Sequence, residues 1–288
     1  MLTVKVPAST SNLGCGFDSV GISFELYNIW TFEKSKAFEL IGFSEYHMHD
    51  NLVQKAYEHV FTSLNKDVIP VRITLVDTQI PVSRGLGSSA SCIIAGVVAA
   101  NHMLSNVLSD EQCINIATQI EGHPDNIAAS YLGGFISSFM KDEKVKTVTY
   151  PVHDSLKFYA LIPNFNLSTH IARQALPKAY ALRDITHTLS RAIQLPYGFA
   201  LGDVMLLKDL FDDRIHQPYR LPLINQAEEI MKAFEKKEVA IAISGAGPSL
   251  ILVSKLELDK LHFDESKFSR WKLIELHVSK SGTTLKEN

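Results

Sequence analysis

The stretch PVSRGLGSSAS (81–91) leads directly into the apolar run CIIAGVVAA (92–100). Gly85 and Gly87 can adopt positive φ angles and bring the backbone close to a ligand. Three serines follow where the first turn of a helix is expected. A helix N-terminus exposes free N–H groups and the positive end of the helix dipole. The stretch therefore predicts either a tight glycine turn before a buried helix or a cradle for phosphate.

The same stretch differs from the common nucleotide-binding loop, GxxxxGK[ST]. It has no lysine, and its glycines have a different spacing. The negative charge of a bound phosphate would therefore have to be balanced by backbone N–H groups, by a metal ion or by Arg84.

The composition predicts a packed globular protein. Of the 288 residues, 46% are hydrophobic and 20% are charged, and the net charge is −3. No basic stripe with interleaved aromatic residues is present, which argues against a nucleic-acid partner. The longest apolar segment is shorter than the ~20 residues that span a membrane, and the N-terminus lacks the pattern of a signal peptide. We therefore expect a cytoplasmic protein without a membrane partner, with Cys15, Cys92 and Cys113 as reduced core residues.

Strands and helices are predicted to interleave in both halves of the chain. Alternating apolar residues predict strands at 2–6, 71–78, 157–163 and 271–280, and two more strands around a glycine turn within 239–255. Helical spacing predicts helices at 51–64, 88–104 and 225–237, and several within 170–211.

A further helix begins at Ser109, with Gln112 completing a capping box and Gly122 closing the helix. The segment MKDEKVKT (140–147) is the most polar connection in the chain. We therefore predict an α+β fold in two lobes, 1–150 and 151–288.

Three motifs, in order along the chain, resemble those of the GHMP kinases. PVSRGLGSSAS resembles the phosphate loop P-x-x-x-G-L-G-S-S-A. PASTSNLGCGFDSVG (7–21) resembles the N-terminal substrate motif, and ISGAGPSL (243–250) resembles the C-terminal glycine motif. The resemblance implies the two-lobed GHMP kinase fold, with a ribosomal-protein-S5-domain-2-like N-terminal lobe and a ferredoxin-like C-terminal lobe.

Further strings resemble one branch of that superfamily, the homoserine kinases. They are EGHPDN (121–126), STHIARQALP (168–177) and HQPYR (216–220), and the resemblance covers essentially the whole chain. It implies transfer of the γ-phosphoryl group of ATP to the side-chain hydroxyl of L-homoserine, a step of threonine biosynthesis. It also implies that ATP binds the loop formed by Pro81, Val82, Ser83, Arg84, Gly85, Leu86, Gly87, Ser88, Ser89, Ala90 and Ser91.

The resemblance also implies a set of charged residues for metal and substrate. Mg²⁺ would be held by Ser88 or Ser89 together with Glu121. Homoserine is a zwitterion, so its ammonium group needs a carboxylate, for which Asp18 is the natural candidate. Its carboxylate needs arginines, which the resemblance assigns to Arg173 and Arg220, with Arg214 as second choice for the latter. Other substrate-pocket roles are implied for Asn12, His123, Asn126 and Gly245.

A general base is the missing part of this set. Other branches carry an aspartate where this chain has Asn126, and an asparagine does not accept a proton at neutral pH. Asp125 is adjacent to it. We favour a mechanism without a dedicated base, in which Thr169 and Asn126 position the hydroxyl. Arg173 and Ser88 complete the candidate catalytic residues.

Three alternatives remain at this stage. The chain could act on another small alcohol such as mevalonate, it could be a catalytically inactive nucleotide-binding relative, or each motif could be a set of turns in a structural domain. The Gly245–Gly247 turn likewise suits a plain hairpin or a site element, and a side chain at either glycine should damage catalysis more than stability. The resemblance implies a homodimer.

Overall fold

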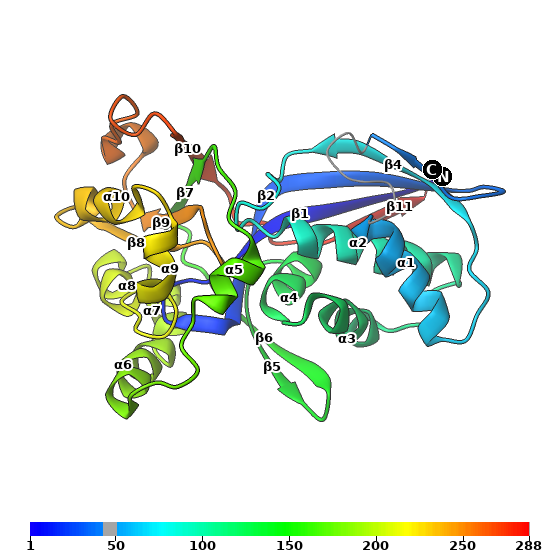
Figure 1. Ribbon diagram of the computed structural model, residues 1–288, viewed down its shortest axis with the longest axis horizontal. Helices are drawn as coiled ribbons and strands as arrows, with labels where there is room; N and C mark the ends of the chain where they lie inside the picture. The colour runs from blue at the N-terminus through cyan, green and yellow to red at the C-terminus, as the bar shows by residue number, and fades with distance from the viewer. Residues whose placement is uncertain (43–50, 288) are drawn as a thin grey trace.

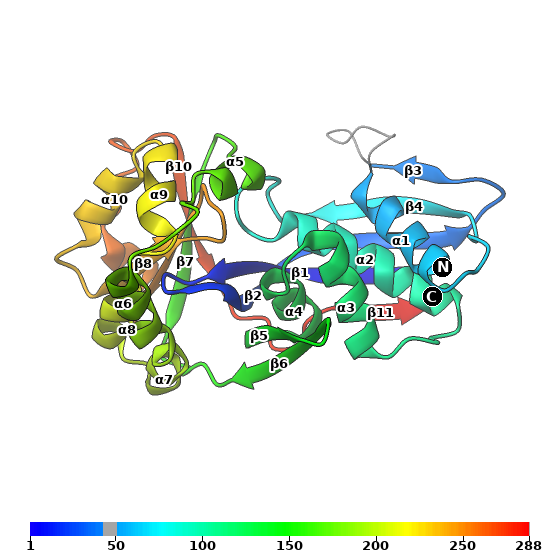
Figure 2. The same ribbon diagram turned by 60° about the horizontal axis from the view of Figure 1, so that its bottom comes forward.

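The computed structural model describes residues 1–42 and 51–287 and has two lobes arranged along its long axis (Figure 1). The first lobe is a sheet with helices on one face, and the second is a smaller sheet with helices packed around it. Figure 2 shows both chain ends at the edge of the first lobe that lies away from the second. Within the described residues, no helix is long and apolar enough to cross a membrane.

The first sheet is built on two long antiparallel strands joined by a tight turn. Its order is β11-β1-β2-β4-β3, and a β5–β6 hairpin pairs with β2 beside this path. The strands are β1 (Leu2–Asn12), β2 (Gly16–Lys34), β3 (Glu39–Ile41), β4 (Val71–Thr78), β5 (Phe135–Lys141), β6 (Lys144–Tyr150) and β11 (Thr284–Glu287).

Four helices cover one face of this sheet (Figure 1). They are α1 (Leu52–Ser63), α2 (Ser88–Met103), α3 (Asp110–Glu121) and α4 (Asp125–Leu132). Helix α2 is apolar nearly all round because it packs against β1 and β2 and is flanked by the other three helices. These contacts hold the first turn of α2 next to the second lobe.

The second lobe has the strand order of a ferredoxin-like fold. Its antiparallel sheet has the order β10-β7-β9-β8, with β7 (Lys157–Pro163), β8 (Val239–Ile243), β9 (Leu250–Ser254) and β10 (Trp271–Leu276). The crossover from β7 to β8 holds α5 (Thr169–Gln174), α6 (Leu182–Ala192), α7 (Leu195–Leu201), α8 (Val204–Leu210), α9 (Gln217–Arg220), η2 (Leu221–Leu223) and α10 (Ala227–Phe234). The second crossover is reduced to η3 (Leu258–Leu261).

Most predicted elements are confirmed. The strands at 71–78 and 157–163 have the predicted limits, and the capping box of Ser109 with Gln112 is formed. The polar segment 140–147 is not a simple linker, because it forms the end of the β5–β6 hairpin. The last predicted strand ends at Leu276, and residues 284–287 then pair with β1 of the first sheet. The lobe boundary near residue 150 stays a prediction.

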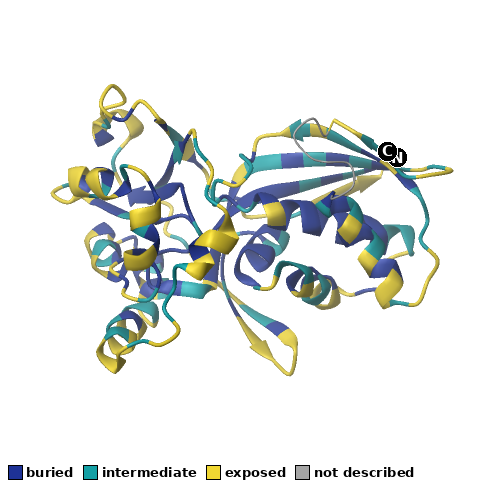
Figure 3. Cartoon of the chain, in the orientation of Figure 1, coloured by how far each residue is buried: buried dark blue, intermediate teal, exposed yellow. Residues whose placement is uncertain are grey.

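A shared apolar core joins the two lobes. It contains Phe135 of β5, Phe158 of β7 and Phe199 of α7, all buried. The ring centroids of Phe135 and Phe199 lie 4.7 Å apart, and those of Phe158 and Phe199 lie 6.2 Å apart. Figure 3 shows buried segments running from one lobe into the other. The lobes are therefore packed against each other and are not merely tethered.

We expect Phe199→Ala to lower the free energy of unfolding by about 3–5 kcal/mol, because it leaves a cavity at this junction. Tyr197→Ala on the same helix is the matched control, since the Tyr197 side chain is exposed and its loss should cost little. Chemical denaturation measures both variants. Equal losses for the two would contradict a shared core.

Candidate active site

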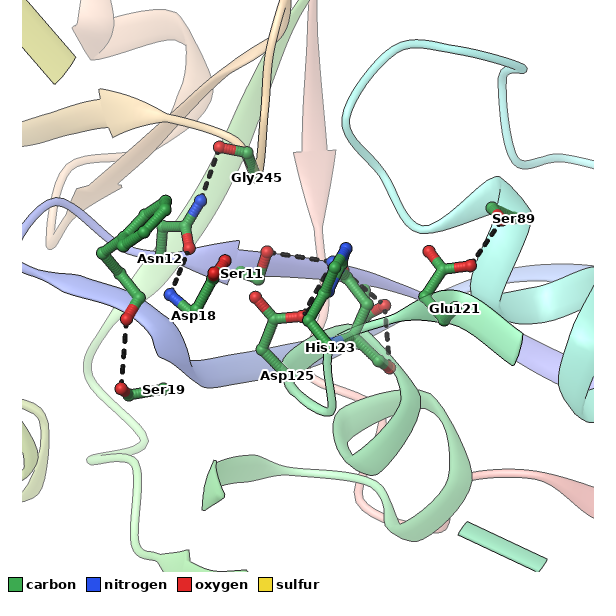
Figure 4. Close-up of polar contacts among 12 residues, drawn as sticks. Ser11, Asn12, Asp18, Ser19, Ser89, Glu121, His123, Asp125 and Gly245 are labelled. Carbon is green, nitrogen blue, oxygen red and sulfur yellow. Dashed lines mark hydrogen bonds and ion pairs between the residues drawn. The ribbon is translucent and has the colours of Figure 1, made fainter. Parts of the chain in front are cut away.

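A cavity of about 210 Å³ opens at the N-terminus of α2, where the two lobes meet. Figure 4 shows Ser89 and Glu121 at one end of this region and Asn12, Asp18 and Gly245 at the other. The structure thus brings together residues from distant parts of the sequence. The predicted site residues that line the cavity are Asn12, Asp18, Val82, Ser83, Arg84, Gly85, Gly87, Ser88, Ser89, Glu121, His123, Asn126, Thr169, Arg173, Arg220 and Gly245.

Four predicted loop residues do not line the cavity. The side chains of Leu86, Ala90 and Ser91 are buried on the inner side of the loop, and Pro81 lies at its start. Leu86 belongs to the apolar core shared by the lobes, and Ala90 belongs to the core of the first lobe. These side chains therefore anchor the loop, while its other side faces the cavity.

The loop needs its two glycines for both conformation and space. Gly85 has φ +76°, and Gly87, the N-cap of α2, has φ +74°. A Cβ at Gly85 would overlap the carbonyl oxygen of Ser244, and one at Gly87 would overlap the Ser9 hydroxyl. The loop is thus pressed between β1 and the β8–β9 turn, with the first turn of α2 open to the cavity.

The β8–β9 turn is held to this loop by hydrogen bonds. The Ser244 hydroxyl donates to the Gly85 carbonyl at 2.6 Å and also contacts the Thr10 hydroxyl at 2.7 Å. The Asn12 amide donates to the Gly245 carbonyl at 2.7 Å. Gly245 lines the cavity, whereas a Cβ at Gly247 would approach Ile224 Cδ1 at 2.8 Å. Substitution at Gly247 would therefore disturb the core of the second lobe.

Oxygen ligands gather beside the first turn of α2. The Ser89 hydroxyl donates to Glu121 Oε2 at 2.6 Å, and Ser88 lines the same cavity. Burial raises the pKa of Glu121, although the Ser89 hydrogen bond and the charge of His123 oppose this effect. Among the described residues, no group of three or more His, Cys, Asp or Glu residues could by itself hold a metal ion.

A histidine–aspartate pair begins α4 beside Glu121. His123 Nδ1 lies 2.6 Å from Asp125 Oδ1, which also accepts from the Asn126 backbone N–H at 2.7 Å. Burial favours neutral forms of both side chains. Their mutual hydrogen bond and charge nevertheless raise the pKa of His123 and lower the pKa of Asp125. Asp125 is therefore a charged carboxylate whose Oδ1 is held by His123 and by the Asn126 backbone.

Asn126 is oriented by serines of β1. Its amide nitrogen donates to the Ser11 hydroxyl at 2.9 Å, and its oxygen accepts from the Ser9 hydroxyl at 3.0 Å. Ser130, one turn further along α4, donates to Ser9 at 2.8 Å. These contacts fix the position of the Asn126 amide at the cavity wall.

Two of the residues predicted to bind substrate bind each other. The guanidinium of Arg173 makes a bidentate ion pair with Asp18, with N–O distances of 2.9 and 3.0 Å. Both side chains are partly exposed, so the net stability contributed by the pair is small. Thr169 lies one turn before Arg173 on α5, and both line the cavity.

The second predicted arginine is buried. Arg220 is only 1% exposed, yet it lines the cavity and donates from Nη1 to the Gly245 carbonyl at 3.1 Å. Burial lowers the pKa of Arg220 to about 10, so it remains charged at neutral pH. Arg214 is not among the residues that line the cavity and pairs instead with Asp184 at 3.3 Å. Of these two arginines, Arg220 is the one placed at the cavity, and its role in binding substrate stays a prediction.

Sequence reasoning missed several residues that hold the site in place. Ser9, Thr10 and Ser11 are almost completely buried and connect β1 to α4 and to the β8–β9 turn. Ser244 of that turn binds the Thr10 hydroxyl and the Gly85 carbonyl. His216 contacts Arg220, and Asp213 accepts hydrogen bonds from the backbone N–H groups of His216 and Gln217. A signal was available, because three successive hydroxyl residues in a central strand must find buried hydrogen-bond partners.

The fold and the loop at α2 define the class of the protein as a GHMP kinase. The family model described as GHMP kinases N terminal domain matches residues 51–134. The homoserine kinase of Clostridium beijerinckii is 36% identical over 295 residues, covering 100% of this chain and 99% of the relative. That of Caldicellulosiruptor saccharolyticus is 37% identical over 302 residues, covering 99% of this chain and 96% of the relative.

A solved structure agrees with these sequences. The crystal structure of homoserine kinase from Cytophaga hutchinsonii matches with a TM-score of 0.85 at 25% identity, covering 99% of this chain and 97% of that chain. The chain belongs to the homoserine kinase family. The GHMP kinase fold and the family expected from the sequence are both confirmed.

The His123–Asp125 pair predicts a pH-dependent contribution to stability. A histidine whose pKa is raised on folding stabilises fully below its unfolded pKa of about 6.5, and this contribution is lost as pH rises through the raised pKa. We therefore expect His123→Gln to lower the free energy of unfolding by about 1.5–3 kcal/mol near pH 6 and by a smaller amount near pH 9.

Chemical denaturation at both pH values measures this difference. His59→Gln is the control, because His59 is exposed on α1 and reports any general effect of replacing a histidine by glutamine. If His123→Gln lowered the free energy of unfolding by more at pH 9 than at pH 6, the His123–Asp125 pair would not hold a proton as described.

Proposed function

We propose that this chain transfers the γ-phosphoryl group of ATP directly, in line, to the side-chain hydroxyl of L-homoserine, giving O-phospho-L-homoserine. The observation that carries the proposal is the cavity itself. It joins the open N-terminus of α2, which suits phosphate oxygens, to a charged end containing Asp18, Arg173 and Arg220. The two ends thus match the donor and the acceptor of the reaction.

The charged end is complementary to a small zwitterion. The ammonium group of homoserine would pair with Asp18, and its carboxylate would pair with Arg173 and Arg220. Binding would replace the partly exposed Asp18–Arg173 ion pair by two contacts to the ligand. Separating this pair costs little free energy, because exposed ion pairs stabilise a protein only weakly. Asn12, which bridges Gly245 and the Asp18 backbone, would hold this end in shape.

The acceptor hydroxyl would be positioned by Thr169 and Asn126 and would lose its proton late, to phosphate oxygens or solvent. Asp125 is a poor base in this arrangement, because its carboxylate already binds His123 and the Asn126 backbone and its pKa is lowered. Phosphoryl transfer depends mainly on alignment and on balancing charge. An essential carboxylate in the pH profile of kcat/KM, together with a folded but inactive Asp125→Asn variant, would refute this mechanism.

The oxygen donors beside α2 fit Mg²⁺. This cation takes oxygen ligands and is usually bound by one or two carboxylates together with substrate phosphates. Glu121 and the hydroxyls of Ser88 and Ser89 would hold the Mg²⁺ ion. A site with a single carboxylate suits a cavity wall that has few acidic residues. When bound, the ion would balance the charge of the phosphate oxygens. Ser88 and the loop N–H groups would align the phosphates.

We expect Glu121→Gln to raise the Mg²⁺ concentration needed for half-maximal activity by roughly tenfold or more, because it removes the charged ligand. Initial rates across a Mg²⁺ titration measure this requirement. Glu111→Gln is the control, since Glu111 lies on the same helix in a surface pair with Lys146. An unchanged Mg²⁺ requirement would remove Glu121 from the metal site.

The activity is tested by coupling ADP release to a spectrophotometric signal, with homoserine and mevalonate as alternative acceptors. We expect Mg²⁺-dependent turnover with homoserine and a kcat/KM for mevalonate lower by orders of magnitude, because mevalonate has no ammonium group for Asp18. Turnover on mevalonate alone would favour the other kinase class. ATP binding without turnover on any alcohol would favour an inactive relative.

Two further features stay predictions from the family resemblance. These are a homodimer and a cytoplasmic location. Sedimentation of the purified chain at assay concentration tests the first, and a monomer that retains full activity would contradict it.

A further inference from the structure

A fully buried histidine connects the substrate motif of the first lobe to Arg220 of the second. His216 directly precedes α9, and none of its side chain is exposed. Its Nε2 lies 2.8 Å from the Gly14 carbonyl in the β1–β2 turn, and its Nδ1 lies 3.3 Å from Arg220 Nη1. Its ring stacks on Phe17 at 5.3 Å with an interplanar angle of 24°.

The two partners of His216 determine its tautomer. Arginine is only a donor, so Nδ1 must present its lone pair to Arg220. A backbone carbonyl is only an acceptor, so Nε2 must carry the hydrogen that binds Gly14. The neutral imidazole with hydrogen on Nε2 therefore satisfies both contacts. Protonation would place an N–H of Nδ1 against the Arg220 donor.

The surroundings favour that neutral form. Burial lowers the pKa of His216 to about 4, and the charge of Arg220 acts in the same direction. Asp213 and Asp18 act in the opposite direction, and Asp213 Oδ2 lies 3.6 Å from Nε2. Asp213 is already occupied, because it accepts from the backbone N–H groups of His216 and Gln217, both at 2.8 Å. It therefore fixes the backbone on which the imidazole is mounted.

The contacts of Arg220 leave one side of its guanidinium available. Nε donates to the Ala172 carbonyl at 3.3 Å, and Nη1 donates to His216 Nδ1 and to the Gly245 carbonyl. In the described part of the chain, no acceptor is hydrogen-bonded to Nη2. The guanidinium is thus held by His216 and by two backbone carbonyls through Nε and Nη1. Phe17 packs at 5.2 Å from Arg220 Cζ.

We propose that His216 is a positioning residue that holds the guanidinium of Arg220 in place, so that Arg220 can receive the carboxylate of the amino-acid substrate. This proposal rests on the proposed function. His216 does not line the cavity, so it acts through Arg220, whose guanidinium it contacts. Its loss should weaken recognition of the carboxylate and leave recognition of the ammonium group and ATP intact.

The test compares homoserine with 3-aminopropan-1-ol, which is the same molecule without the carboxylate. His216→Phe keeps an aromatic ring on Phe17 but removes both hydrogen bonds. We expect its homoserine KM to rise roughly tenfold to a hundredfold, because a hydrogen bond to a charged group is lost. Its kcat and its KM for ATP should stay within about threefold of the native values. The Ki of 3-aminopropan-1-ol, as a competitor of homoserine, should stay unchanged.

Tyr219→Phe is the matched control, because Tyr219 lies on the same helix with its side chain partly exposed. Circular dichroism and a thermal melt establish that each variant is folded. If His216→Phe fails to fold, His216→Gln, which keeps one donor and one acceptor, replaces it in the same comparison, with a smaller rise in KM expected.

Two results would overturn the proposal. One is an equal loss of affinity for homoserine and for 3-aminopropan-1-ol, which would indicate a merely structural role. The other is an unchanged homoserine KM in the folded variant. Failure of the native protein to phosphorylate homoserine would instead refute the proposed function, so the two failures are distinguishable.

Discussion

The packing of backbone against backbone at Gly85 and Gly87 is the constraint on which the site depends. These two residues lie where β1, the β8–β9 turn and the start of α2 meet, with no room for a Cβ. The hydroxyls of Thr10 and Ser244 then bind the three segments together. Because the contacts come from both lobes, the N–H groups at the start of α2 and the charged end of the cavity are fixed relative to one another.

Charge in the cavity is arranged in separate zones. Glu121 and the serines of α2 offer oxygen ligands at one end, and Arg173 and Arg220 offer positive charge at the other. The Asp125 charge between them is satisfied by His123, so it does not compete for cations. The loop before α2 has no lysine, and Arg84 is the cation with which it lines the cavity.

The sequence was most informative where chemistry repeats locally. Glycine spacing, capping and apolar periodicity predicted the loop, α2, α3 and strands such as β4, and family strings placed Asp18, Arg173 and Arg220 in one cavity. It was least informative about contacts between distant segments. The Asp18–Arg173 pair, the Ser9–Asn126 bond and the support of Arg220 by His216 depend on tertiary packing, which no local pattern encodes. The turn between β5 and β6 was missed because its residues, Asp142 and Glu143, resemble those of a linker.

The path of residues 277–287 ties the integrity of the first lobe to the chain beyond the second. After β10 the chain returns to the first lobe, and β11 pairs with β1 at the edge of the first sheet. Without β11, that edge of β1 would present unpaired N–H and C=O groups. Dividing the chain at one point between the lobes would therefore leave β11 on the wrong fragment and open the first sheet.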